Sequence, residues 1–199
     1  MTDRTIALVI GDHAVLGSVA AELTARGDDV VRLADAGTET AELNQLVSSG
    51  LTVSSLVIGY TPGDGGAERA LARIRTVEPH RSAAGLRIVL VSGRDYLGWP
   101  GRAESSIELA GVVALGRSLA LELGVDGTTV NVVCPPGDLG MTKATEDPWE
   151  APPVPPTGPV EVDDVAYAVV FLTESYTGYI TGQVIHISGG LSVLSSLSA

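Results

Sequence analysis

The chain is poor in cysteine and lysine, and each shortage excludes a class of protein. Cys134 is the only cysteine, so an internal disulfide framework and a cysteine-based zinc site are excluded. A lone cysteine within an apolar run is expected to be a buried structural thiol rather than a nucleophile. Lys143 is the only lysine, and the 12 basic residues stand against 24 acidic ones, a formal charge of −12. A surface of that sign repels nucleic acids and anionic membranes, so neither is expected as a partner.

Long apolar runs and the common catalytic signatures are missing as well. Hydrophobic residues make up 45% of the chain, but no run approaches the length of a membrane span. The opening MTDRTIALVI lacks the apolar core and cleavage site of a signal peptide, so we expect a cytoplasmic protein. There is no GxSxG elbow, HExxH pair or P-loop, and only three scattered histidines, so no metal site is expected. A length of 199 residues suits a single domain spanning residues 1–199.

What the chain does contain is a strand–helix–strand unit over residues 86–134. An apolar run over 86–91 predicts a buried strand that ends at Ser92. A loop with two glycines and a proline follows, and then a long apolar helix is predicted over residues 103–123. A second buried strand over 128–134 completes the unit.

The N-terminal half repeats the alternation of strands and helices. Apolar runs predict strands at residues 5–10, 30–33 and 53–60, and helical patterns lie at 18–26, 38–49 and 67–77, with Thr38 as a candidate N-cap. The last of these helices is expected to point Leu71, Ile74 and Val77 inward and Arg69, Arg73 and Arg75 outward. The turn from Gly11 to Gly17 joins a strand to a helix, which is typical of the start of a dinucleotide-binding fold.

In the order of its predicted elements and in its sequence motifs, the chain resembles the short-chain dehydrogenase/reductase family, and most of all its 3-oxoacyl-carrier-protein reductase-like branch. The resemblance is strongest over residues 86–137 and 161–190, which include the closing segment YITGQVIHISGG. It implies an α/β fold, a Rossmann-like doubly wound parallel sheet. The chain between residues 33 and 53 is too short for one of the family's strand–helix crossovers, so we expect about six strands with an edge strand missing. Eight of the 11 prolines fall in a loop over residues 135–160, where the family has its substrate-covering loop.

The cofactor site implied by the resemblance is altered. The family's turn reads TGxxxGxG, and this chain keeps Gly11 and Gly17 but has Ile10 for the threonine and Val15 for the middle glycine. A valine there is expected to intrude where phosphate should sit. The family's NNAG segment falls on residues 58–61, where none of its four residues is kept in place.

We therefore expect no strongly bound cofactor. Gly11, Gly17 and Asp35, which lies near the position of the family's ribose-binding acid, are the remnants of the site. Weak NAD(P) binding stays compatible with the two glycines.

The catalytic residues implied by the resemblance are a tyrosine that donates a proton, a lysine four residues later and a serine on the preceding strand. Aligning PGRAES with the family's PGxxxY puts Ser105 at the tyrosine and Leu109 at the lysine, with Ser92 at the serine. None of the five tyrosines has a lysine four residues later, so no other alignment restores the pair. The catalytic set is thus empty except for the remnant Ser92, and we expect no dehydrogenase activity from the chain alone.

The long helix is expected to be an interface. Its middle reads LAGVVALG over residues 109–116, which is apolar on every face, although only one face can meet the sheet. In the family the same helix forms a four-helix interface between subunits. The residues expected to contact a partner are Leu109, Gly111, Val112, Val113, Ala114 and Gly116.

Three functions remain open at this point. The first is a catalytically inactive, reductase-like subunit that assembles with and supports an active homologue, for which a homodimer is the simpler alternative. The second is an enzyme with a non-standard, cofactor-independent site under the proline-rich loop. The third is a small-molecule or acyl-binding module that uses the family's substrate pocket.

Overall fold

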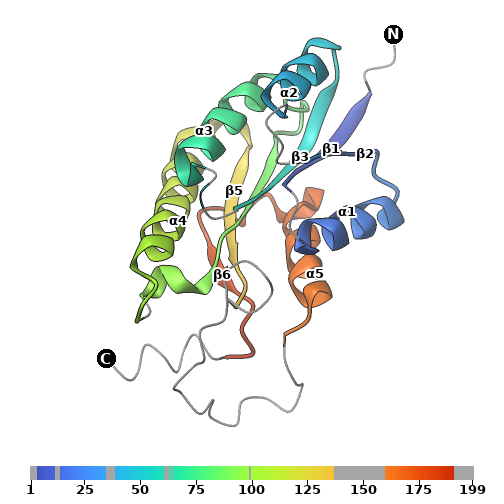
Figure 1. The fold of residues 1–199 in the computed structure, drawn as a ribbon. Helices are drawn as coiled ribbons and strands as arrows, with labels where there is room; N and C mark the ends of the chain where they lie inside the picture. Colours follow the sequence, from blue (N-terminus) through green and yellow to red (C-terminus); the bar gives the residue numbers. More distant parts are fainter. Residues whose placement is uncertain are drawn as a thin grey trace.

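The computed structural model describes residues 4–11, 14–34, 39–60, 63, 65–98, 100–136 and 160–190, and within them strands alternate with helices (Figure 1). The strands are β1 (Thr5–Ile10), β2 (Val30–Leu33), β3 (Thr52–Gly59), β4 (Arg87–Val91), β5 (Thr129–Cys134) and β6 (Val184–His186). The α-helices are α1 (Ala14–Arg26), α2 (Glu39–Ser48), α3 (Gly66–Val77), α4 (Ala103–Leu123) and α5 (Val162–Leu172). Four short 3₁₀ helices join them, namely η1 (Glu78–His80), η2 (Arg94–Leu97), η3 (Gly124–Asp126) and η4 (Ser175–Thr177).

The six strands form one sheet in the order β2-β1-β3-β4-β5-β6, and every neighbouring pair is parallel. The chain starts at β1, steps outward to β2, then crosses over to β3 and continues outward to β6. This is the doubly wound arrangement that the sequence predicts, with β2 at the edge where a strand was expected to be missing. The prediction of a six-stranded Rossmann-like sheet is confirmed.

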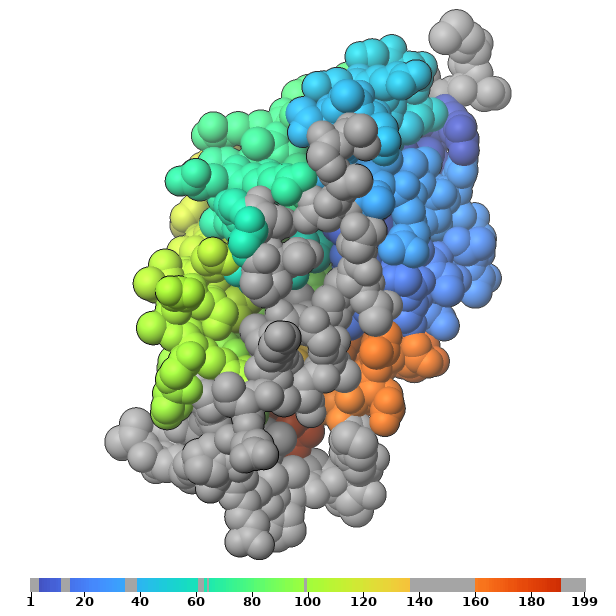
Figure 2. Space-filling view, in the orientation of Figure 1, coloured from blue at the N-terminus to red at the C-terminus, as the bar shows by residue number. Residues whose placement is uncertain are grey.

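Helices cover both faces of the sheet. Helices α2, α3 and α4 lie on one face, and α1 and α5 lie together on the other (Figure 1). The space-filling view shows the same division, with the blue of α1 and the orange of α5 on one side and the green of α3 and α4 on the other (Figure 2). Because strand side chains alternate, Leu56 and Ile58 of β3 pack in the core between the sheet and helices α2, α3 and α4. Val57 packs in the core between the sheet and helices α1 and α5. Both faces are therefore apolar, as parallel sheets require.

Parallel pairing brings the carboxyl ends of β1, β3, β4 and β5 to one edge of the sheet. Gly11, Tyr60, Ser92 and Pro135 follow these four strands directly and so lie along that edge. Ligands of open α/β sheets bind at this edge, so the candidate site is sought there.

The predicted element boundaries agree with the structure to within a residue or two for most elements. Helix α4 has the predicted bounds, whereas α1 begins at Ala14, four residues before the predicted start. The candidate N-cap Thr38 and most of the proline-rich segment, residues 137–159, lie outside the described residues.

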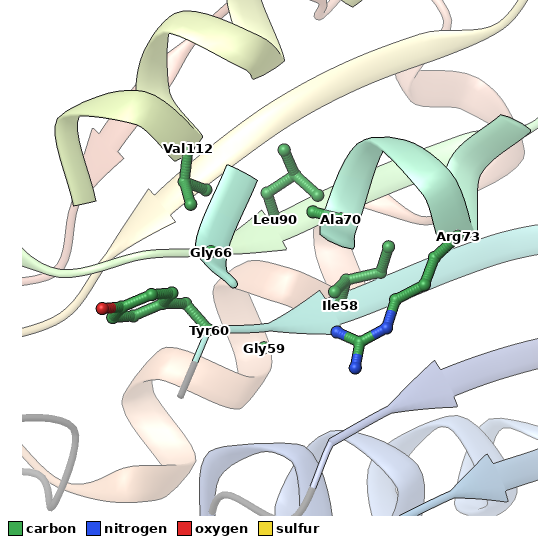
Figure 3. A pocket seen from close by; sticks show the side chains of 8 residues that line it. All are labelled: Ile58, Gly59, Tyr60, Gly66, Ala70, Arg73, Leu90 and Val112. Atoms are coloured by element: carbon green, nitrogen blue, oxygen red, sulfur yellow. The ribbon is translucent and has the colours of Figure 1, made fainter. Parts of the chain in front are cut away.

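The prediction that Arg73 points outward from α3 is wrong. Its side chain is buried and pairs with Glu39 at the start of α2, with Nε 2.6 Å from Oε1 and Nη2 2.5 Å from Oε2. In Figure 3 the Arg73 side chain extends from α3 past Ile58, whereas the ring of Tyr60 lies beyond the end of β3. The ion pair joins α2 to α3, which explains why a charged residue can occupy a buried position of the helix.

Within the described ranges, no helix is long and apolar enough to cross a membrane.

Candidate functional site

The turn between β1 and α1 keeps the close packing that its glycines allow. Gly11 has φ +128°, and a Cβ there would lie 2.6 Å from Leu16 Cδ1, so only glycine fits. Leu16 also fills the space above Gly59, where a Cβ would lie 2.5 Å from the same carbon atom. The turn is thus fixed by contacts between the ends of β1 and β3 and the first turn of α1.

Val15 does not intrude into this turn, contrary to the prediction. Its side chain is fully buried and packs in the core between the sheet and helices α1 and α5. Asp12 and Asp35 lie outside the described residues.

Arg32 of β2 adds a positive charge beside the turn. Its Nη2 donates a hydrogen bond to the Gly11 carbonyl at 3.4 Å, and its Nη1 lies 3.8 Å from the position that a Cβ on Gly17 would take. Among the described residues outside the helix's own backbone and the neighbours of Gly17, no other atom approaches that position within 4 Å. As far as the described residues go, the start of α1, where backbone N–H groups favour anions, is therefore open next to Gly17 and flanked by a guanidinium.

The three residues that the resemblance aligns with the family's catalytic positions lie at the end of β4 and on the first two turns of α4. Ser92 is fully buried after β4, and its hydroxyl donates to the Leu109 carbonyl at 3.2 Å. Ser105 lies in the first turn of α4, and its hydroxyl donates to the Arg102 carbonyl at 3.1 Å. The Leu109 side chain is fully buried, and a Cβ on Gly93 would lie 3.3 Å from it. Both hydroxyls are engaged with backbone, and the lysine position is part of the apolar core.

Tyr60 occupies the family's NNAG segment and contacts helix α4. Its hydroxyl donates a hydrogen bond to the Glu108 carboxylate, which also accepts the Gly63 N–H at 3.4 Å. The ring is buried and lies at the end of β3 (Figure 3). Tyr60 therefore ties the loop after β3 to α4.

A second tyrosine, Tyr96, stacks on His186 at this edge of the sheet. The ring centroids lie 5.6 Å apart with an interplanar angle of 17°. Burial raises the pKa of Tyr96, with a smaller contribution from Cys134, whereas burial and then the charge of Arg94 lower the pKa of His186. A tyrosine that donates a proton to a carbonyl near neutral pH needs a lowered pKa, whereas the pKa of Tyr96 is raised. Sequence reasoning missed this contact because the two residues are 90 positions apart and belong to no local motif.

Cys134 ends β5 as a buried thiol. Burial raises its pKa to about 12, so the reactive thiolate is scarce at neutral pH. This agrees with the expectation of a structural cysteine.

Helix α4 contacts both the sheet and helix α3. Of the six residues expected at an interface with a partner, Leu109, Val112, Val113 and Gly116 are buried inside the chain itself. A Cβ on Gly116 would lie 2.4 Å from Val132 of β5, and one on Gly111 would lie 3.3 Å from Ala67 of α3. Two faces of the helix are thus covered within the chain, and Ala114 is the only one of the six that is exposed.

An outer stripe on α4 remains open, formed by Ile107, Ala114 and Leu121. The three residues are spaced seven apart, so they lie on one face of the helix. The exposed fractions of Ile107 and Leu121 are 73% and 84%. Large exposed apolar side chains in a row are typical of a helix that packs against another helix.

Comparison with known protein families identifies a reductase family. The model of the family described as enoyl-(acyl carrier protein) reductase matches residues 69–192. The chain is 30% identical over 215 residues to subunit BbsC of the (2S)-((R)-hydroxy(phenyl)methyl)succinyl-CoA dehydrogenase of Thauera aromatica, covering 97% of this chain and 86% of that subunit. Subunit BbsD of the same enzyme is 38% identical over 117 residues, which cover 54% of this chain and 45% of BbsD.

A third relative is the 3-oxoacyl-(acyl-carrier-protein) reductase FabG of Haemophilus influenzae. It is 41% identical over 99 residues, 47% of this chain and 40% of FabG. The chain thus spans less than half of BbsD and FabG but most of BbsC.

Solved structures show the same fold. An enoyl-(acyl-carrier-protein) reductase (NADH) from Aquifex aeolicus superposes with a TM-score of 0.76 at 16% identity, covering 96% of both chains. YwfH, an NADPH-dependent reductase involved in bacilysin biosynthesis, superposes with a TM-score of 0.75 at 17% identity, covering 94% of this chain and 99% of that one.

These comparisons overturn the prediction that no cofactor is to be expected. The family model is that of a reductase, and the two structures are named for NADH and NADPH. The prediction rested on Val15 as an obstruction and on the altered residues at 10 and 58–61, and the Val15 side chain packs inside the core instead.

Proposed function

The chain belongs to the short-chain dehydrogenase/reductase family, and from that premise we propose that it is a non-catalytic reductase subunit that assembles with an active homologue. The observation that carries the proposal is the pair of residues at the catalytic positions. Ser105 replaces the proton donor and Leu109 replaces the lysine that the family places one helical turn later.

Proton transfer to a carbonyl requires an acid whose pKa lies near the working pH. A serine hydroxyl is a much weaker acid than a phenol, and Ser105 already donates to the Arg102 carbonyl. Leu109 is fully buried and supplies no charge to lower a neighbouring pKa. The nearby tyrosines do not substitute, because Tyr60 donates to Glu108 and burial raises the pKa of Tyr96.

A nicotinamide nucleotide fits the first turn of α1. Gly11 allows the close turn against Leu16, Gly17 leaves space beside the first turn of the helix among the described residues, and Arg32 places a guanidinium there for the anionic phosphates. The nucleotide supplies hydride when it is bound. The chain's own residues position its phosphates, while Ser92, Ser105 and Leu109 leave the proton-transfer position empty of an acid.

Two observations support assembly with a homologue. BbsC and BbsD, which match this chain, are named as two subunits of one dehydrogenase. The outer stripe of α4 presents Ile107, Ala114 and Leu121 for another helix, and exposed apolar rows of this kind favour association. An active partner would provide the proton-donating acid that this chain lacks. In return, α4 of this chain would pack against a helix of the partner.

The first experiment is an activity assay of the purified protein. With NADH or NADPH and a 3-oxoacyl thioester, the chain alone should show no change in absorbance at the nicotinamide band above background. An active homologue assayed in parallel is the positive control. Turnover in a homogeneous preparation that is lost in Ser92→Ala would contradict the proposal.

The second experiment is native mass spectrometry of the protein isolated from its own host. A complex that contains this 20.4 kDa chain and a homologous reductase supports the proposal. A homodimer without any reductase subunit, or a monomer, would argue against the supporting role. The inactivity of the chain would remain a separate result of the assay.

A further inference from the structure

The outer stripe of α4 is symmetric about its middle residue. Ile107 lies seven residues before Ala114, and Leu121 lies seven residues after it. A second copy of α4 that ran antiparallel to the first would place Ile107 of each chain opposite Leu121 of the other, with the two Ala114 residues at the two-fold axis. Antiparallel helices also oppose their dipoles, which is the favourable direction. By shape alone, the stripe fits a second copy of itself.

Two acids stand beside the stripe on one flank of the helix. At about 100° per residue, Glu104 and Glu122 are both rotated about 80° from Ala114 in the same sense. Both are exposed, and neither has an ion-pair partner among the described residues. Arg117 is rotated about 60° in the opposite sense, so the basic residue of α4 lies on the other flank. The third acid of the helix, Glu108, is already bound within the chain.

Pairing with a second copy brings the two exposed acids together. The two-fold axis of an antiparallel pair sets each flank of one helix against the same flank of the other. With the axis at Ala114, Glu104 of one copy reaches the level of Gly124 in the other, about 3 Å along the helix axis from Glu122. This contact occurs twice, once at each end of the pair. Like charges side by side oppose association, and the formal charge of −12 on each copy has the same effect.

We propose that α4 selects a helix of a homologous subunit with Lys or Arg near both ends over a second copy of itself, and that Glu104 and Glu122 determine the choice. Such a helix gains two ion pairs where a second copy meets two repulsions. The apolar stripe supplies the contact, and the acids determine which chain makes it. This choice of partner rests on the proposed assembly with a homologue and specifies the chemistry of the partner's helix.

The experiment uses a charge-reversed form of this chain as the probe. Glu104→Lys/Glu122→Lys places lysines at both ends of the stripe, so pairing of the variant with itself stays repulsive. Its pairing with the native chain becomes attractive at both ends. Sedimentation velocity of a 1:1 mixture at low ionic strength should show a mixed dimer, with a dissociation constant at least about tenfold below that of either protein alone. The advantage should disappear in about 1 M salt, where the Debye length is about 3 Å.

The matched control is Glu22→Lys/Glu42→Lys, which changes the net charge by the same amount on α1 and α2. It should give no mixed dimer beyond the association of the native chain alone. Circular dichroism establishes that each variant is folded. An equal gain from the control would assign the association to net charge and overturn the proposal. A native homodimer as tight as the mixed dimer, or no mixed dimer at low ionic strength, would overturn it as well.

The single change Glu122→Lys gives a second readout if the double variant does not fold. Each copy then presents Glu104 to a lysine of the other, so this variant should form a homodimer that the native chain does not form. Adding Leu121→Glu to it should abolish that homodimer, because a charge enters the apolar contact. Association of Glu122→Lys as weak as that of the native chain would contradict the selection by charge.

Failure of this selection leaves the proposed inactivity of the chain untouched, because the activity assay measures the chain alone. Turnover in that assay would remove the proposed function without changing which helix the stripe binds. The two proposals therefore fail on different measurements.

Discussion

Leu109, which the resemblance aligns with the family's lysine, is part of the core. It lies one helical turn after Ser105, as the family's lysine does, yet its side chain is fully buried beside Gly93. The Ser92 hydroxyl, which would position a substrate carbonyl, instead donates to the Leu109 backbone. In this chain the residue therefore makes a packing contact between the end of β4 and α4.

Reinstating the lysine should cost stability. Leu109→Lys removes a fully buried side chain and places a charge in its cavity, so unfolding should become easier by about 3 kcal/mol or more. Thermal denaturation should show Tm lower by roughly 6–12 °C. Ser105→Tyr, at a half-buried position, is the control and should change stability by about 1 kcal/mol or less. Native-like stability together with reductase activity in the double variant would disprove this view.

His186 predicts a pH dependence of stability. Burial and the charge of Arg94 lower its pKa from the ordinary value of 6.5, so the folded state takes up a proton less readily than the unfolded chain. Stability should be unaffected above about pH 6.5 and should fall as the pH drops below 6.5 through the lower folded pKa.

His186→Phe keeps the stacking on Tyr96 without a titrating group. The loss of stability between pH 7 and 5, measured by urea unfolding, should be smaller in this variant than in the native chain. His186→Gln should show the same weaker pH dependence at a lower stability. An unchanged slope in both variants would assign the pH dependence to another group.

At the scale of elements, the Glu39–Arg73 pair joins two helices that cover the same face of the sheet. Glu39 is 1% exposed and also binds Arg69, with Nη2 2.9 Å from Oε2. Breaking a buried pair from one side leaves an uncompensated charge. Glu39→Gln should therefore lower the free energy of unfolding by about 3–5 kcal/mol.

The matching double variant tests whether the loss comes from the unpaired charge. Glu39→Met combined with Arg73→Met should lose less than either single change, because no charge stays buried. Arg75→Met, on the exposed side of α3, is the control. Additive losses in the double variant would show that the two side chains act independently.

Local patterns in the sequence predict where helices and strands lie better than they predict which side chains those elements contact. The bounds of α4 and, to within a residue, of the first five strands follow from apolar runs and turn residues, which are local signals. The burial of Arg73 depends on Glu39, which is 34 residues earlier, and no pattern within α3 reveals it. The roles given to Ser92, Ser105 and Leu109 rest on the resemblance to the reductase family and stay a prediction. The direction of Val15 was not predictable, because it depends on the packing of α1 against α5 and the sheet.

At the scale of the whole molecule, different faces of α4 serve the fold and the proposed assembly. Its inner faces pack on β5 and α3, whereas its outer stripe of Ile107, Ala114 and Leu121 has no cover among the described residues. Val112 and Val113 were first expected at the partner contact, but both are buried within the chain. The residues that test assembly therefore differ from those that the sequence indicates.

Leu121→Glu should break the complex and leave the subunit folded. A charge on the outer stripe disrupts a helix–helix contact, so light scattering should show a smaller species with a native circular dichroism spectrum. Val112→Glu, by contrast, should unfold the chain because it buries an unpaired charge. A Leu121→Glu complex of native size would show that subunits meet elsewhere.

The contact between α1 and α5 has a consequence for folding during translation. Strand β3 pairs with β1, and each strand after β3 pairs with the strand before it in the chain, so the sheet can extend as the chain leaves the ribosome. Helix α1, however, packs against α5, whose residues are translated more than 130 positions later. At a translation rate of about 5–20 residues per second, α5 is synthesised on the order of ten seconds after α1. During that time the face of the nascent sheet that α5 covers stays exposed. A nascent chain stalled before residue 160 should therefore be captured by chaperones and cut readily by protease, whereas one released after residue 190 should resist both.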